Sequence, residues 1–232
     1  MNSPMSGEQS MIQIKGGAKP SLEKRAYQEI REQIINAVYL PGTLLSENEL
    51  AEQLKMSRTP IRAAISLLET EGFLESVRGR GVFVKEISFR EFREMFEVLV
   101  SMQLFVLDIA ASRELKFDLP LLREHLGRQT KAAEEGDNVA YYDSSLQFVG
   151  TMLSASRNSN MLQILENIKG KYMFKLLSYR KQNAHLVPKP NQARSANQRI
   201  YEALESGDLP GAKNAIHELN ELVYEQLKMF DL

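Results

Sequence analysis

Apolar residues recur at helical spacing in three successive segments near the N-terminus, and a start signal precedes each segment. Ser21 is a plausible N-cap for the first stripe, which includes Val38 and stops at the break at residues 40–42. Ser46–Glu49 has the capping-box form ahead of the second stripe, and Ser57 opens the third. We therefore predict three helices, with a spacer of about three residues between the second and the third.

Two short runs of β-forming residues follow the third helix, at residues 73–77 and 81–84. Between them, Arg78-Gly79-Arg80 has the composition of a hairpin tip. Three helices followed by a hairpin are the order of a winged helix-turn-helix, which we place at residues 21–86. Residues 1–20 are polar and rich in Gly and Ser, without the apolar region of a signal peptide, and we expect a disordered leader there.

After residue 87 the pattern is helical throughout, without a further strand signal. Polar, Pro and Gly positions separate six helical stretches, at residues 88–113, 119–135, 138–156, 160–179, 191–206 and 209–230. The predicted fold class is therefore mainly α. A winged domain of three helices and a β-hairpin precedes an all-α domain over residues 88–230.

Composition narrows the classes of function. The 232 residues are 43% hydrophobic and 25% charged, which is ordinary for a globular protein with a packed core. With a net charge of −1, a DNA-binding protein must concentrate its basic residues locally. The absence of cysteine excludes disulfides and thiolate ligands and fits a cytoplasmic protein. The longest apolar stretches are far shorter than the roughly 20 residues that cross a bilayer, so we expect no membrane partner.

The predicted third helix has the side chains of a DNA-reading helix at its N-terminal end. Arg58 and Arg62 are four residues apart and share one face, from which Arg can bond to guanine in the major groove. The hydroxyls of Ser57 and Thr59 suit phosphate oxygens. No acidic residue occurs between positions 52 and 69, so we expect this surface to be locally basic.

The predicted hairpin tip adds Arg78 and Arg80, placed like a wing that touches the DNA backbone or the minor groove. Two arginines at this spacing alone would more often be a solvated basic face than a DNA contact. The full order of elements, together with an arginine-bearing wing, favours DNA binding.

Four segments carry a resemblance to a known family: residues 40–51, 57–64, 68–74 and 78–84. They belong to a match that covers about 65 residues without a gap, and this part of the chain resembles the GntR family of transcription regulators. The resemblance implies DNA contacts at Asn48, Arg58, Thr59, Arg62 and Gly79. The family often has arginine at the position of Asn48, so this contact and the usual operator sequence are in doubt.

The helical part resembles the FadR-like branch of that family, whose domain is an antiparallel helical bundle with a central effector cavity. Many members hold a divalent metal there through one Asp and three His. The matching positions in this chain are Asp143, Gln147, Asn197 and either Leu219 or Asn220. Amide side chains are weak ligands for a transition metal, so we expect no metal and no cofactor.

We expect a small-molecule effector in a mostly apolar cavity with a few neutral polar groups, a lining that suits an apolar or neutral ligand better than a small carboxylate. The candidate effector-binding residues are Leu99, Met102, Gln103, Asp143, Gln147, Tyr172 and Asn197. The alternative is that these side chains simply pack, with no ligand. Of the three histidines, His125 and His217 are expected on exposed helix faces and His185 in a polar loop.

The resemblance implies a homodimer that binds a palindromic operator, with repression relieved by ligand binding. An enzyme is the runner-up class, but the sequence shows no Gly-rich phosphate loop, metalloprotease helix or readable catalytic triad. Another alternative is an adaptor that acts through protein partners, whose bundle should lack an enclosed cavity. Gly150 and Gly170 stand alone inside helical patterns.

Overall fold

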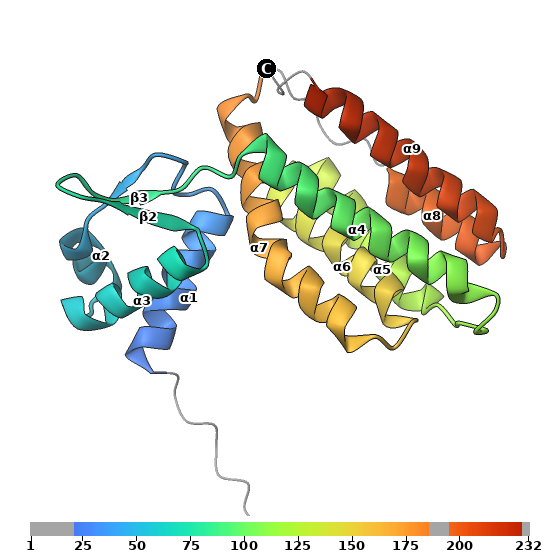
Figure 1. The fold of residues 1–232 in the computed structure, drawn as a ribbon, viewed down its shortest axis with the longest axis horizontal. Helices are drawn as coiled ribbons and strands as arrows, with labels where there is room; N and C mark the ends of the chain where they lie inside the picture. Colours follow the sequence, from blue (N-terminus) through green and yellow to red (C-terminus); the bar gives the residue numbers. More distant parts are fainter. Residues whose placement is uncertain (1–20, 186–194, 229–232) are drawn as a thin grey trace, which may run out of the picture.

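The computed structural model describes residues 21–185 and 195–228. The predicted leader at residues 1–20 and the predicted end of the helical domain at residue 230 lie outside these ranges. Figure 1 shows two bodies, a small N-terminal head and an elongated helical bundle, joined by a short linker. The fold class is mainly α, as predicted.

The head contains three helices and a three-stranded antiparallel sheet of strand order β1-β3-β2. Its elements are α1 (Leu22–Ile35), β1 (Leu44–Leu45), α2 (Glu47–Leu54), α3 (Arg58–Thr70), β2 (Leu74–Val77) and β3 (Gly81–Val84). The side chain of Ser21 accepts a hydrogen bond from the Lys24 amide at 3.2 Å, and that of Ser46 accepts one from the Glu49 amide at 3.4 Å. These caps fix the starts of α1 and α2.

Two details of the head differ from the sequence prediction. Helix α1 ends at Ile35, before the predicted break, because Ala37 takes a positive φ of 52°. Val38 therefore leaves the helical stripe and is 59% exposed. The short strand β1 was not predicted; it pairs with β3 through Leu44 and Leu45. Gly81 allows this pairing, since a Cβ there would lie 2.7 Å from Leu44 Cδ1.

Six helices form the described part of the bundle. They are α4 (Phe89–Ala110), α5 (Leu119–Glu135), α6 (Asn138–Ser154), α7 (Ser159–Gln182), α8 (Ala196–Glu205) and α9 (Leu209–Lys228). Ser88 and Glu91 form a reciprocal capping box at the start of α4, and Asp118 caps α5. Residues 85–88 connect β3 to α4, where the sequence places the domain boundary. No helix in the described ranges is long and apolar enough to span a membrane.

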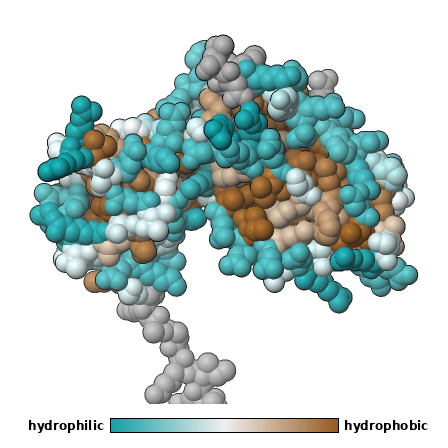
Figure 2. Space-filling model, in the orientation of Figure 1, coloured by the Kyte–Doolittle hydropathy of each residue, from teal (hydrophilic) through white to brown (hydrophobic). Residues whose placement is uncertain are grey.

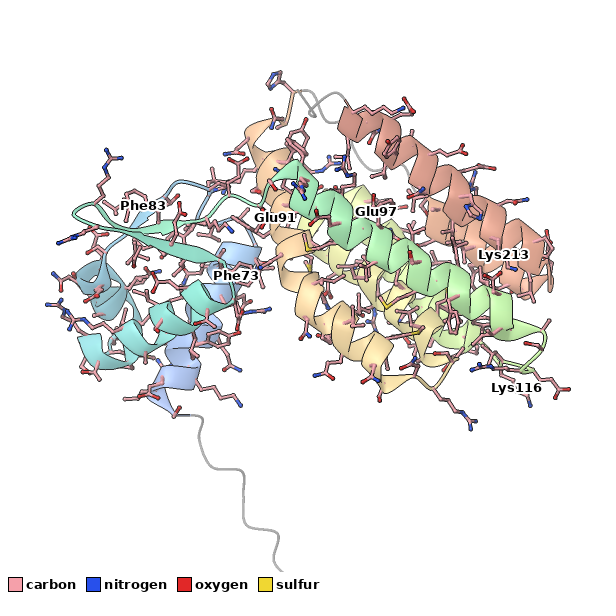
Figure 3. All side chains as sticks on the ribbon, in the orientation of Figure 1. Phe73, Phe83, Glu91, Glu97, Lys116 and Lys213 are labelled. Atoms are coloured by element: carbon pink, nitrogen blue, oxygen red, sulfur yellow. The ribbon has the colours of Figure 1, made fainter. Side chains whose placement is uncertain are left out.

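Helix α7 of the bundle packs against the head. Phe174 on α7 is fully buried within the hydrophobic cluster of the head, although it belongs to the bundle. One turn earlier, the backbone at Gly170 approaches α1 so closely that a Cβ would lie 3.0 Å from Ile35 Cδ1. Phe73 of the head reaches the same point and lies beside α7 (Figure 3). The lone glycine in this helix therefore marks the contact between head and bundle.

Candidate DNA interface and effector cavity

The N-terminal end of α3 presents the two arginines of the predicted DNA-reading face. The side chains of Arg58 and Arg62 are 54% and 62% exposed. One carboxylate oxygen of Glu47, Oε2, accepts hydrogen bonds from both, at 2.9 Å from Arg58 and 2.7 Å from Arg62. These bonds hold the pKa of Glu47 below its usual value. Helix α2 therefore brings one acidic side chain, Glu47, into the surface that the sequence predicts to be locally basic.

The remaining candidates on the helix-turn-helix are exposed polar residues. Asn48 and Thr59 are exposed on α2 and α3, and Ser57 is exposed at the N-cap of α3. The Ser57 side chain makes no capping hydrogen bond, and the first turn of α3 has no acidic residue. Its hydroxyl and the first amides of α3 are therefore available to an anion such as a phosphate.

The turn between β2 and β3 forms the predicted wing, and Arg78, Gly79 and Arg80 are all exposed there. The Arg80 amide donates to the Val77 carbonyl at 2.9 Å, and Gly79 has a φ of 76°. A positive φ at the third position of such a turn favours glycine. Figure 1 shows this turn pointing away from the bundle.

The bundle contains a cavity of about 400 Å³ that is partly open to solvent, and this volume is within the range of sites for small ligands. Helices α4 to α9 all contribute to its lining. Four of the predicted effector-binding residues line it, namely Leu99, Gln103, Tyr172 and Asn197. A cavity of this size favours an effector-binding bundle over one that only packs.

Three predicted effector-binding residues do not line this cavity. Met102 packs in the apolar cluster between helices of the bundle. Asp143 forms a 2.7 Å ion pair with Lys169 and lines a separate hollow between α1 and helices α6 and α7. Gln147 donates to Asp143 and accepts from Arg128, so its amide is used at both ends. All three lie on helices that contribute to the cavity, α4 and α6, but on faces that do not line it.

A group of neutral polar side chains lies in the cavity wall. Asn197 Nδ2 lies 3.0 Å from Ser145 Oγ and 3.4 Å from Gln129 Oε1. Tyr141 lines the same cavity and hydrogen-bonds to Gln129. Burial raises the pKa values of Tyr141 and Tyr172, so both phenols stay protonated and can donate to a ligand.

Lys175 also lines the cavity and was not a candidate from the sequence. Of the described lining residues it is the one with a charged side chain. It is 6% exposed, and its ammonium lies 3.7 Å from Glu86 Oε1 and 3.8 Å from the Phe89 ring centroid. Burial lowers the pKa of Lys175. The sequence feature that could have identified Lys175 as a cavity residue is its place among the apolar positions of α7.

The histidines do not gather with other metal-ligating side chains. His125 is buried, contrary to the sequence expectation, and its Nε2 lies 3.0 Å from Thr151 Oγ1. His217 and His185 are exposed. Among the residues that the structure describes, no group of three or more His, Cys, Asp or Glu is placed to hold a metal ion.

Comparisons with known proteins give the same two-part division. Residues 22–84 match the family described as bacterial regulatory proteins, gntR family, and residues 94–221 match the FCD domain. The chain is 28% identical over 137 residues to the Nta operon transcriptional regulator of Aminobacter aminovorans. It is 32% identical over 144 residues to the gluconate operon transcriptional repressor of Bacillus licheniformis. These matches cover 59% and 61% of this chain and 64% and 58% of the two relatives.

Two solved structures share the fold. A GntR transcriptional regulator from Rhodococcus sp. RHA1 superposes with a TM-score of 0.74 at 20% identity, over 88% of this chain and 96% of that one. Escherichia coli McbR/YncC gives a TM-score of 0.70 at 22% identity, over 91% and 99%. The chain therefore belongs to the gntR family of bacterial regulatory proteins and carries an FCD domain, and the proteins that it matches in sequence are transcriptional regulators rather than enzymes.

Proposed function

We propose that this protein is a cytoplasmic transcription repressor that binds a palindromic operator as a homodimer and releases it when a small molecule occupies the bundle cavity. The observation that carries the proposal is the presence, in the same chain, of an exposed arginine face on α3 and a cavity of about 400 Å³ in the bundle. One relative, from Bacillus licheniformis, bears the name of a repressor. An effector that favours one arrangement of the bundle changes DNA affinity by linkage.

The proposed DNA contacts divide by chemistry. Arg58 and Arg62 read base edges in the major groove, where a bidentate arginine contact selects guanine. The phosphate contacts come from hydroxyl, amide and guanidinium groups, which set the position of the head on the duplex. We assign these contacts to Asn48, Ser57, Thr59, Arg78, Gly79 and Arg80. Glu47 holds the two reading arginines in place before DNA binds.

The surface of α4 supports the proposed homodimer. Val98 and Phe105 are 39% and 43% exposed on this helix, and Ile164 on the neighbouring α7 is 40% exposed. Figure 2 shows apolar residues gathered on this face of the bundle. Large exposed apolar patches are characteristic of protein interfaces. We propose that two copies of the chain pair through this face.

Binding-site selection on genomic DNA with the full chain tests the DNA-binding part of the proposal. We expect enrichment of one short palindrome, lost in the Arg58→Ala/Arg62→Ala variant. Arg113→Ala/Arg128→Ala is the matched control, because it removes the same charge from the surface of the bundle and should retain the palindrome. Loss of selection in both variants, or in neither, would contradict base reading by α3. No enrichment with the native chain would favour an adaptor.

Sedimentation equilibrium tests the dimer. The native chain should sediment as two copies, and Val98→Asp/Phe105→Asp should shift it toward one, because burying two carboxylates in the interface is costly. Leu67→Asp is the control, since Leu67 is 51% exposed on α3 of the head and lies outside the bundle. A native monomer, or an unchanged dimer in the α4 variant, would refute pairing through this surface.

A further inference from the structure

Lys175 is a buried cation with weak partners. Its side chain is 7% exposed, whereas that of Glu86, its ion-pair partner, is 70% exposed. The 3.7 Å separation between Nζ and Glu86 Oε1 is longer than a charge-assisted hydrogen bond, which is typically about 2.8 Å. The Phe89 ring adds a cation–π contact. An ammonium carries three donors, so Lys175 has unused capacity to bind an anion on the cavity side.

The rest of the cavity wall is apolar or neutral. Phe92 and Tyr172 stack with their ring centroids 4.8 Å apart, and Phe96 and Leu99 extend the same apolar wall along α4. The amide and hydroxyl groups around Asn197 are neutral. One cation in such a wall matches a molecule with an apolar body and a single acidic group.

We propose that the effector is an amphipathic anion whose acidic group bonds to Lys175 Nζ and displaces the Glu86 carboxylate. This inference rests on the proposed role of the cavity as an effector site. It differs from the sequence-based preference for an apolar or neutral ligand, because that preference did not include Lys175. The displaced Glu86 carboxylate remains hydrated, because its side chain is largely exposed to solvent.

The displacement acts on the connection between wing and bundle. Glu86 lies in the four-residue linker 85–88, between the end of β3 and the start of α4. On either side of it, the Lys85 amide donates to the Phe73 carbonyl at 2.9 Å and Ile87 is buried in the head core. The Lys175–Glu86 ion pair therefore connects the cavity wall directly to the linker. Losing it loosens the linker and lets the head change its position on DNA.

Two fluorescent probes with the same body test the anion preference: anilinonaphthalene sulfonate, which carries a sulfonate, and N-phenylnaphthylamine, which is neutral. Both are titrated into the full chain. Lys175→Met should weaken sulfonate binding about tenfold or more, the range of a lost hydrogen bond to a charged group, and leave neutral binding within about twofold. Lys175→Arg should retain sulfonate binding. Glu86→Gln should strengthen it severalfold, since the competing carboxylate is gone.

The Leu176→Trp variant tests whether the two probes bind inside the cavity. Leu176 lines the cavity, so the larger indole should weaken both probes if they bind there rather than on the surface. Hydrogen exchange of the linker amides, residues 85–88, supplies a second readout. It should rise with the sulfonate probe and in Glu86→Gln without probe, but not with the neutral probe.

The outcomes separate this inference from the proposed function. If Lys175→Met weakens both probes equally, or leaves sulfonate binding unchanged, the anion site is refuted while the cavity remains a ligand site. If neither probe binds, or Leu176→Trp has no effect on either, the effector role of the cavity fails as well. If sulfonate binding depends on Lys175 but linker exchange does not change, the displacement of Glu86 is refuted.

Discussion

Gly170 provides the most direct test of how the head is held on the bundle. A Cβ at this position on α7 would lie 2.8 Å from Arg31 Nη2, 3.0 Å from Ile35 Cδ1 and 3.1 Å from Phe73 Cζ. The arginine end can swing away, but Ile35 and Phe73 are packed and must each shift by a few tenths of an ångström. Gly170→Ala therefore forces the head away from α7.

The magnitude follows from two opposed effects. Replacing Gly by Ala within a helix stabilises it by about 1 kcal/mol, whereas overpacking a close contact costs roughly 1–3 kcal/mol. We expect Gly170→Ala to lower the free energy of unfolding by about 0–2 kcal/mol. Gly127→Ala is the matched control, because Gly127 lies in α5 with nothing within 4 Å of a built Cβ. It should raise the free energy of unfolding by roughly 0.5–1 kcal/mol.

Urea denaturation of the full chain measures both changes, and hydrogen exchange locates them. In Gly170→Ala the amides of α1 should exchange faster than in the native chain, because α1 is the element that the new methyl displaces. In Gly127→Ala they should not. If Gly170→Ala stabilises the chain as much as Gly127→Ala and α1 keeps its protection, the described docking of α1 on α7 is wrong.

Three further predictions concern single side chains. Arg58→Ala should cost roughly 1–3 kcal/mol of specific DNA binding, measured by fluorescence anisotropy, and an unchanged affinity would remove it from the base-reading set. Phe174→Ala should lower the free energy of unfolding by about 3–5 kcal/mol and speed hydrogen exchange in α1. Phe148→Ala, which removes a side chain within the bundle core, should leave the α1 amides protected. Burial lowers the pKa of His125, so the unfolded chain binds its proton more tightly and stability falls as the pH drops through about 6.5. Urea titrations at several pH values should show a smaller fall in the free energy of unfolding for His125→Gln than for the native chain, and an unchanged fall for His217→Gln. An equal pH dependence in the two variants would contradict this prediction.

The parts of the fold that depend on local signals were predictable from the sequence. The serine caps of α1 and α2 act within three residues, and Ser21 and Ser46 each accept the expected amide hydrogen bond, although Ser46 and Glu49 do not form the full capping box. The turn at Gly79 needs a positive φ that the residue type itself indicates. Helical periodicity located the six bundle helices because each must bury one apolar stripe.

Features that depend on distant segments were missed. Glu47 reaches Arg58 and Arg62 across the turn between two helices, and a gap in acidic residues along the sequence does not exclude this. His125 is buried by α6, which sequence pattern alone could not place against it. Lys175 was not a candidate from the sequence, because the linker and α4 that contact its side chain are distant along the chain. In each case the tertiary partner, not the local pattern, decides the role of the side chain.

Helix α7 is the element through which the cavity and the head must communicate. One face of α7 contacts the head through Gly170 and Phe174. Another face lines the cavity through Tyr172, Lys175 and Tyr179. Packed interiors have little free volume, and the contact at Gly170 is so close that an added Cβ would lie 3.0 Å from Ile35 Cδ1, so it leaves little room to absorb a shift of the helix. A ligand that pushes α7 from the cavity side must therefore either move the head with the helix or open the contact at Gly170. Both outcomes change how the head meets DNA, so ligand binding and DNA binding are coupled whichever of the two occurs.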